Sequence, residues 1–362
     1  MDKYIGLDMS DKETVACVIT PGCKDIYQTL PTEVSALRAF LARQREGGHR
    51  VHATFEVCGR AGWLYDGLVD TVDTLAVSNP SQMTWIYRTA KKTDRIDARK
   101  QAVLLQMGEL PTVHMPDAAV RQWRGEIQHR RKLIERACQI KNRLRAHLKG
   151  KGVDRPDGKM GWWTQKCRRW MLGVRPDDLA LMDLLEELAL LEKQMDRITT
   201  LLDKRLKKHP GAAVLLTIGG VGPRTTEAVL AYADDIHRFA RGKEFCAYFG
   251  LTPRRDESGA VRRVGHISKQ GPSVARWLLA ESSWRVVKKS PALRAFYERV
   301  QHGQPGRKKI AIVAVARKLL SIMWAMLITG EAFNEALVLR QEFLQGDVVP
   351  RRRASRRKRK CR

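Results

Sequence analysis

The chain has 362 residues, which is too long for one ordinary hydrophobic core, so its length predicts two or three units of about 100 to 150 residues. Hydrophobic residues make up 43% and charged residues 29%, a composition that excludes wholesale disorder. Lys and Arg number 67 against 39 Asp and Glu, a formal net charge of +28 at pH 7, which favours a polyanionic partner.

The first 112 residues show alternating strand and helix patterns. This alternation predicts an α/β domain with a mixed sheet over residues 1–112. Thr93 is the expected N-cap of the last helix, which ends before Pro111. Strands are predicted at 3–8, 12–20, 50–57 and 74–77, the first two as a hairpin, and helices at 33–45, near 60–70 and from Thr93 onward.

Residues 113–210 are predicted to form a long helical coiled-coil arm. A basic helix is expected from Asp117 to Gly150, and a second helix from Asp178 to Lys208. Between them, residues 150–176 carry Gly and Pro and predict a loop or helical turn. The second helix repeats apolar residues at alternating spacings of three and four, a coiled-coil pattern whose partner is either the first helix or another protomer. They are Leu181, Leu184, Leu188, Leu191, Met195, Ile198 and Leu202.

Residues 211–335 predict a second, mostly α-helical domain, and residues 336–362 a basic tail. The tail holds nine of the cations within residues 351–362, so an excess of about +19 remains on the rest of the chain. In the domain, GGVG between two helical stretches predicts a helix-hairpin-helix turn in which Gly220 and Gly222 let backbone N–H groups approach a phosphate. A glycine turn without that role is the alternative.

Nucleic acid is the expected polyanion, because Lys and Arg that neutralise phosphates release condensed counterions. A solvated basic surface or a membrane-surface protein is the alternative. The seven cysteines form no C-x-x-C pair, which argues against a zinc finger. The first ten residues are too polar for a secretory signal, and no uninterrupted apolar run reaches the roughly 18 residues of a membrane span. We therefore expect a cytoplasmic protein without a membrane partner.

Four acidic residues are candidates for a metal site. Asp8 ends the first strand and Glu56 ends a later one, while Asp94 and Asp97 lie three apart on one helix face. Four convergent carboxylates repel one another unless cations lie between them, and Mg²⁺ prefers such oxygen ligands. Each acid taken alone is an ordinary surface residue, so their order and placement carry the prediction.

Three motifs around these acids resemble the signature of a known family. GLDMS, ATFEVCGRAG and KKTDRIDAR are similar to the acidic motifs of the RuvC-like, ribonuclease-H-type domain in DEDD transposases of the insertion-sequence 110 family. KTDRIDAR is the most specific of them. The resemblance implies that Asp8, Glu56, Asp94 and Asp97 are catalytic and hold Mg²⁺ or Mn²⁺.

The segment from LLTIGGVG to ISKQG resembles the second domain of that family, so the likeness covers most of the chain except the arm and tail. It implies a serine nucleophile that forms a phosphoserine link to DNA, at Ser258 in RRDESGAVRR. Ser268 in GHISKQG is the competing serine. Gly259 is expected to leave the Ser258 hydroxyl accessible, and no His or Lys is assigned as its base. Four arginines are expected to neutralise the scissile phosphate: Arg254, Arg255, Arg262 and Arg263.

The resemblance thus implies an insertion-sequence transposase or recombinase that exchanges DNA strands in the prokaryotic nucleoid. It further implies a structured non-coding guide RNA and a homo-oligomer, a dimer or tetramer, in which the two domains meet between protomers. Two other functions remain open at this point. One is a metal-only endonuclease of the Holliday-junction-resolvase type, in which water attacks the DNA; the other is a non-catalytic nucleic-acid-binding protein.

Overall fold

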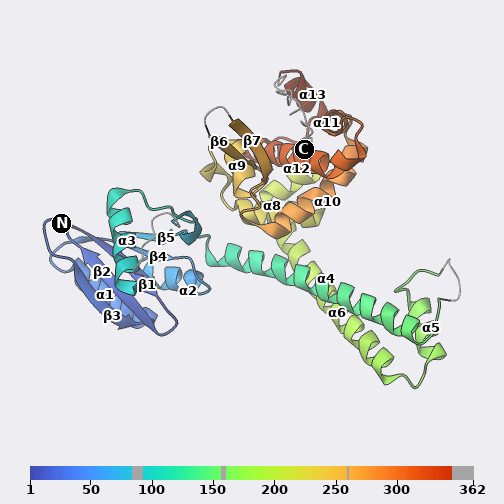
Figure 1. Ribbon diagram of the computed structural model, residues 1–362, viewed down its shortest axis with the longest axis horizontal. Helices are drawn as coiled ribbons and strands as arrows, with labels where there is room; N and C mark the ends of the chain where they lie inside the picture. Colours follow the sequence, from blue (N-terminus) through green and yellow to red (C-terminus); the bar gives the residue numbers. More distant parts are fainter. Residues whose placement is uncertain (84–92, 156–159, 259–260, 345–362) are drawn as a thin grey trace, which may run out of the picture. The chain divides into compact units, whose positions relative to one another are not determined.

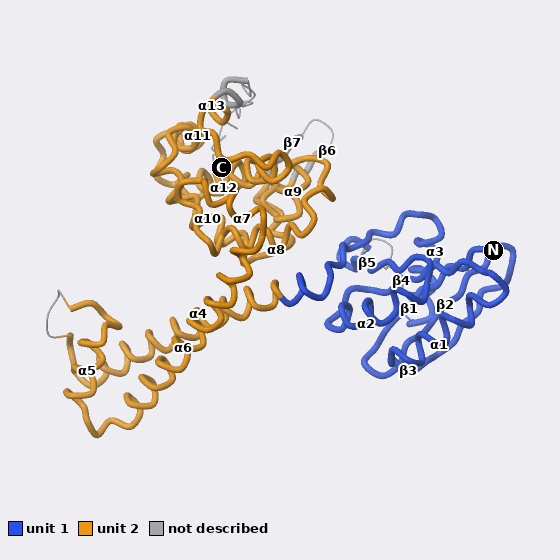
Figure 2. Tube along the Cα trace, turned by 180° about the vertical axis from the view of Figure 1, so that it is seen from behind, with its two compact units in different colours: residues 1–122 blue, residues 123–362 orange. Residues whose placement is uncertain are grey.

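The computed structural model describes residues 1–83, 93–155, 160–258 and 261–344, without the side chains of 255–264 and 340–344. Lys91 and Lys92 of the KKTDRIDAR motif, Gly259 and the basic tail from 345 lie outside the described residues. The chain divides into two compact units, residues 1–122 and 123–362, with the division inside the first long helix (Figure 2).

The first unit contains a five-stranded mixed sheet with strand order β3-β2-β1-β4-β5 (Figure 1). β1 is antiparallel to β2 and parallel to β4, and β4 is parallel to β5. The predicted mixed sheet is therefore confirmed. The strands are β1 (Asp2–Met9), β2 (Glu13–Ile19), β3 (Ile26–Pro31), β4 (Arg50–Glu56) and β5 (Thr74–Ser78), and the helices are α1 (Val34–Arg45), α2 (Ala61–Leu68) and α3 (Asp94–Met107), with a short 3-10 turn η1 (Pro80–Gln82).

Alternation along the central strands divides the sheet into two faces. Ile5 and Leu7 of β1 pack with Leu37 of α1 and Leu64 of α2. On the opposite face, Cys17 of β2 and its neighbours pack against Ala98 and Ala102 of α3. The helices α1 and α2 thus cover one face and α3 covers the other.

The strand β3 was not predicted from the sequence. It is an edge strand that pairs with β2 alone, and Leu30 is the only residue within it that is buried. A strand with so little buried apolar content lacks the alternating pattern by which strands are recognised. The N-cap prediction is confirmed, because the Thr93 hydroxyl accepts a hydrogen bond from the Ile96 N–H at 3.4 Å.

The predicted helical hairpin arm is present as α4 (Ala118–Gly150) and α6 (Leu179–Lys208), which run antiparallel. Polar contacts fix their direction: Arg130 donates to Thr199 at 2.8 Å near one end, and His147 lies 2.7 Å from Asp178 near the other. Leu188 of α6 and Leu144 of α4 are fully buried in one shared core. The apolar seam is therefore covered by α4 within the same chain. The stretch expected as loop or helical turn contains α5 (Gln165–Val174), which packs on that core through Cys167.

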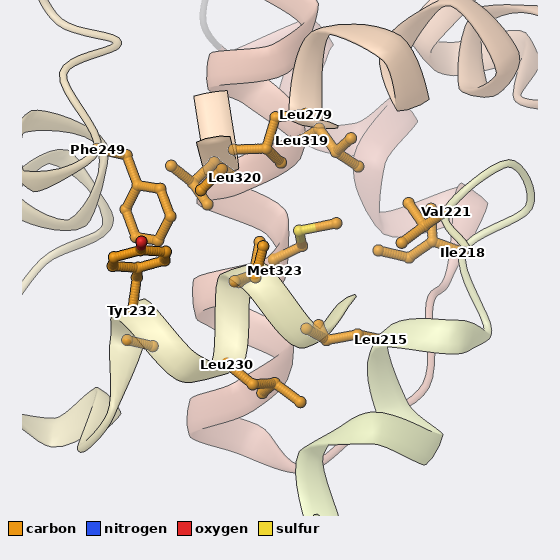
Figure 3. Close-up of a cluster of buried hydrophobic side chains, with 14 of the residues drawn as sticks. Leu215, Ile218, Val221, Leu230, Tyr232, Phe249, Leu279, Leu319, Leu320 and Met323 are labelled. Atoms are coloured by element: carbon orange, nitrogen blue, oxygen red, sulfur yellow. The ribbon is translucent and has the colours of Figure 1, made fainter. Parts of the chain in front are cut away.

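The rest of the second unit is mostly helical, as predicted, with one two-stranded hairpin in addition. Figure 3 shows its core, where Leu320 and Met323 of α12 lie among Leu230 of α8, Leu279 of α10 and other apolar side chains. Its elements are α7 (Pro210–Leu216), α8 (Pro223–Ala233), η2 (Ile236–Arg238), α9 (Gly242–Tyr248), β6 (Pro253–Ser258), β7 (Val261–Ile267), α10 (Ser273–Lys289), α11 (Pro291–Gln301), η3 (Pro305–Arg307), α12 (Lys308–Thr329) and α13 (Glu335–Leu344).

One stretch of the described chain, Pro305–Thr329, is long and apolar enough on average to cross a membrane, although Arg317 and Lys318 lie in its middle. One such helix is weak grounds for a membrane span, because a core helix has the same composition. Here α12 packs against α9, α10 and α11 and supplies buried side chains to the core. We therefore interpret α12 as a core helix. Its core residues are Ala316, Leu319, Leu320, Met323 and Met326.

Candidate functional site

The first two predicted acids stand at the adjacent ends of two central parallel strands. β1 and β4 pair in register as far as Leu7 and Phe55, and the next step along both strands sets Asp8 beside Glu56. Neighbouring residues in register on parallel strands project to the same face of a sheet. Both side chains are partly buried and both contact other groups of the protein. The topology therefore brings these two carboxylates to one edge and one face.

The helix α3 crosses that same face in direct contact with β1. A Cβ placed on Gly6 would lie 2.0 Å from the Ala98 carbonyl oxygen and 2.8 Å from the Ala102 nitrogen. Gly6 and Asp8 are two residues apart on one strand and so share a face. The absence of a side chain at Gly6 allows α3 to approach the strand on the side toward which Asp8 projects.

The second pair of acids lies in the first turn of α3, with different exposure. Asp97 is buried, with 7% of its surface exposed, whereas Asp94 is exposed. Asp97 immediately precedes Ala98, the residue that contacts Gly6. The Lys100 ammonium lies 3.9 Å from the Asp97 carboxylate. A helix N-terminus stabilises negative charge, so both carboxylates are favoured at this position. Asp97 therefore lies on the helix that covers the face of Asp8 and Glu56.

The chemistry of these acids suits a divalent cation. Carboxylate oxygens are the ligands that Mg²⁺ and Mn²⁺ prefer. Within the described residues, no three Asp, Glu, His or Cys side chains are gathered closely enough to hold a metal ion. The fold thus sets Asp8 and Glu56 on one face of the sheet and Asp97 on the helix that covers this face, while the described side chains are not drawn together into a ligand set and Asp94 is exposed.

Two buried polar side chains beside these acids were not predicted from the sequence. Gln101 is fully buried, and neither its amide nitrogen nor its amide oxygen has a hydrogen-bond partner in the described structure. The Thr54 hydroxyl, on the β4 residue that pairs with Gly6, is likewise buried without a partner. Such orphans are rare because each costs the desolvation of a polar group. Their presence fits a polar ligand at this face. The four-residue spacing from Asp97 to Gln101, one helical turn, was the available signal.

The candidate serine lies on the β6–β7 hairpin. Ser258 is the last residue of β6 and pairs through its backbone with Val261, and Arg255 pairs with Val264. All four predicted arginines are on these two strands. The side chains from 255 to 264 and the residue Gly259 lie outside what the structure describes. The described guanidinium is that of Arg254, which donates to the Ser268 carbonyl oxygen at 3.3 Å. The fold therefore sets Ser258 and the arginines on one hairpin, with Ser268 just beyond it.

The two glycines of the GGVG turn differ in their surroundings. Gly220 has φ of +103°, and a Cβ there would lie 2.7 Å from the Val286 backbone nitrogen of α10. Gly222 is the N-cap residue of α8, and no atom lies within 4 Å of the position a Cβ would take. Close packing accounts for Gly220, whereas at Gly222 the backbone beside the helix N-terminus is open to a ligand.

A buried ionic group joins α8 to the base of the arm. Glu227 is 1% exposed, and burial raises its pKa to about 7 although the Arg224 guanidinium lies 3.0 Å away. Arg224 also pairs with Asp203 of α6. Burial also lowers the pKa of Arg130 on α4, and the positive charge of Arg130 interacts electrostatically with Glu227. Because these side chains come from α4, α6 and α8, they tie the arm to the C-terminal domain.

Comparison with known proteins gives two family matches and several relatives. Residues 5–152 match a transposase family model of the DEDD type named for IS110, and residues 212–298 match the transposase family IS116/IS110/IS902. The chain is 26% identical to a probable family 20 transposase of Pseudomonas aeruginosa over 75% of this chain and 82% of that protein. It is 24% identical to the transposase for insertion sequence element IS1111A of Coxiella burnetii over 92% of this chain and 91% of that one. It is also 30% identical to a pilin gene-inverting protein of Moraxella lacunata, over 35% of this chain and 39% of the relative.

Proposed function

The chain belongs to the IS116/IS110/IS902 family of transposases, and on that premise we propose that it cuts and rejoins DNA at the ends of an insertion sequence by transesterification. Its N-terminal unit is a ribonuclease-H-like DEDD domain, which implies a divalent metal. The observation that carries the proposal is the contact of α3 with β1 at Gly6, because it lays the helix that carries Asp97 over the face of Asp8 and Glu56.

In this proposal Asp8, Glu56, Asp94 and Asp97 hold Mg²⁺ or Mn²⁺. A bound divalent cation supplies Lewis-acid stabilisation of the charge that develops on a phosphate. The protein contributes the rigid sheet edge that carries two of the acids and the helix that carries the other two. The buried polar atoms of Gln101 and Thr54 support a polar ligand at this place.

The second part of the proposal assigns Ser258 as the nucleophile. The Ser258 oxygen forms a bond to phosphorus as one P–O bond of the DNA strand breaks, and the departing strand end takes up a proton as a hydroxyl. A hydroxyl of another strand then attacks the phosphoserine, which restores a phosphodiester and the serine. The number of phosphoester bonds is conserved, so strand exchange needs no external energy. The gene inversion in the name of the Moraxella relative supports rejoining over hydrolysis.

The net charge of +28 supports nucleic acid as the partner. We propose that a structured non-coding RNA guides target choice, and that the protein acts as a homo-oligomer in the cytoplasm, on nucleoid DNA. Recombination between two plasmids that carry the element ends tests the RNA. We expect strand exchange to require the flanking non-coding region, and equal exchange without that region contradicts RNA guidance.

A covalent-trapping experiment tests the serine. The full-length protein is incubated with Mg²⁺, end-labelled DNA of the element ends and the transcript of the flanking region, then resolved on a denaturing gel. We expect a protein–DNA adduct that Ser258→Ala abolishes and the matched control Ser268→Ala retains. Asp8→Asn is expected to remove both adduct and cleavage. Cleavage by Ser258→Ala at the parent rate, with no adduct in either protein, would establish the metal-only nuclease instead.

A further inference from the structure

A large cavity in the C-terminal domain is separate from the residues assigned above. It has a volume of about 1590 Å³ and is lined by residues of α9, β7, α11, α12 and α13, together with the segments that join them. Pockets for drug-sized ligands span about 300–1,000 Å³. The cavity is therefore large enough for an extended ligand rather than a single small molecule. We call it the α12 groove.

The floor of the α12 groove is apolar and includes aromatic rings. It includes Val313 and Trp324 of α12, which are partly buried at the edge of the core, with Phe296 and Phe333 from neighbouring segments. Some of this floor is open to water: Ile310 is 59% exposed and Leu337 is 48% exposed. Apolar side chains that lie exposed together within a cavity indicate a binding surface.

The charges that line the groove are almost all positive. Of the described lining residues, Glu331 is the only acid. Six of the lining cations, Lys318 excepted, take no part in the salt bridges of the described second unit, and the Arg307 Nε is buried without a hydrogen-bond partner. The groove thus combines an apolar floor with an excess of positive charge. The cations are Arg241, Lys243, Lys269, Arg307, Lys309, Arg317 and Lys318.

We propose that the α12 groove binds a single-stranded segment of DNA, with bases on the apolar floor and phosphates against the cations. Single-strand binding sites combine a cationic groove with rings on which bases stack. A duplex offers phosphates but keeps its bases in the stack, so it leaves the apolar floor uncovered. The basic tail of this chain is an unsuitable occupant, because like charges repel.

The position of the groove favours DNA as the strand. Gly265, His266 and Ile267 of β7 line it, and β7 is the partner strand of β6, which ends at Ser258. The assignment of DNA rests on the proposed function, since strand cleavage at Ser258 would free a single strand beside this hairpin. The single-strand preference itself rests on the groove alone.

Fluorescence anisotropy of the full-length protein tests the proposal. The probes are a labelled DNA strand of about twelve nucleotides, its duplex, and an RNA strand of the same sequence. Ile310→Glu places a negative charge on the exposed floor, and Ile328→Glu is the matched control, since Ile328 is on the same helix, is 38% exposed and lies outside the lining. Lys309→Gln removes one lining cation, and Lys308→Gln, at an exposed residue outside the lining, is its control.

We expect Ile310→Glu to weaken binding of the DNA strand about tenfold or more while the duplex is affected less, and Ile328→Glu to bind as the parent. Lys309→Gln is expected to lower the slope of log K against log salt by about 0.7, the contribution of one phosphate on a single strand. Equal effects of Ile310→Glu and Ile328→Glu, tighter binding of the duplex than of the strand, or tighter binding of the RNA than of the DNA overturns the proposal.

The DNA cleavage assay separates this proposal from the proposed function. If DNA is cleaved in a metal-dependent way but Ile310→Glu binds the strand as tightly as the parent, the proposed function stands and the groove proposal fails. If Ile310→Glu weakens strand binding but DNA is not cleaved with Mg²⁺ or Mn²⁺, the groove proposal stands and the proposed function fails.

Discussion

Replacing Gly6 with alanine tests whether α3 delivers Asp97 to the strand ends. The added Cβ would lie 2.0 Å from the Ala98 carbonyl oxygen, whereas ordinary contact begins at 3.4 Å. The Cβ is fixed to the backbone of β1 and the carbonyl oxygen belongs to the backbone of α3. The clash is therefore relieved only if α3 moves away from β1, by about 1.4 Å, the difference between these two distances. Overpacking of this kind costs about 1–3 kcal/mol of stability. A displacement of about 1 Å at a catalytic site costs about 100-fold in rate.

The assays are urea unfolding followed by circular dichroism, and metal-dependent DNA cleavage at a temperature where the variant remains folded. Gly59→Ala is the matched control, because it lies in the same unit and a Cβ there meets no atom within 4 Å. We expect Gly6→Ala to lose about 1–3 kcal/mol of unfolding free energy and about 100-fold of the cleavage rate, with Gly59→Ala close to the parent in both. Parental cleavage by a folded, destabilised Gly6→Ala protein would refute the idea that the position of α3 sets the site.

Two further predictions concern the second unit. Burial raises the pKa of Glu227 to about 7 from an ordinary value of 4.5. Between these two pH values the folded state therefore retains a proton that the unfolded state releases. The stability that the protonated carboxyl provides at low pH is lost as pH rises toward about 7. Glu227→Gln removes this titration. Between pH 5 and pH 8 we expect the unfolding free energy of the wild type to fall by up to about 3 kcal/mol relative to that of the variant. Urea unfolding at each pH measures this, and a difference that does not depend on pH contradicts the prediction. Leu188→Ala truncates a fully buried arm residue and should cost about 2–5 kcal/mol, whereas Leu190→Ala, at a position 55% exposed on the same helix, should change stability by less than about 0.5 kcal/mol. Similar losses for the two leucines, measured by urea unfolding, would mean that α4 does not cover the α6 seam.

Local patterns predicted most of the elements because each leaves a periodic or capping signal. Thr93 begins α3 as expected, and the leucine repeat of α6 is buried against α4 in the same chain. The edge strand β3 left almost no signal, since Leu30 is its only buried residue. Gly220 was predicted to approach a phosphate, but its packing against the α10 backbone could not be foreseen, because α10 lies more than fifty residues further along the chain.

The amino-acid sequence by itself determined the α/β and helical parts of this protein, its excess of positive charge and the family to which it belongs, because periodicity, composition and short motifs are local properties. Only the tertiary structure decided that α3, which carries Asp97, covers the face of Asp8 and Glu56, since this follows from the β1–β4 register and from the contact of α3 at Gly6. The α12 groove is likewise a product of packing, because its cations come from segments between Arg241 and Lys318 that meet only in the folded domain.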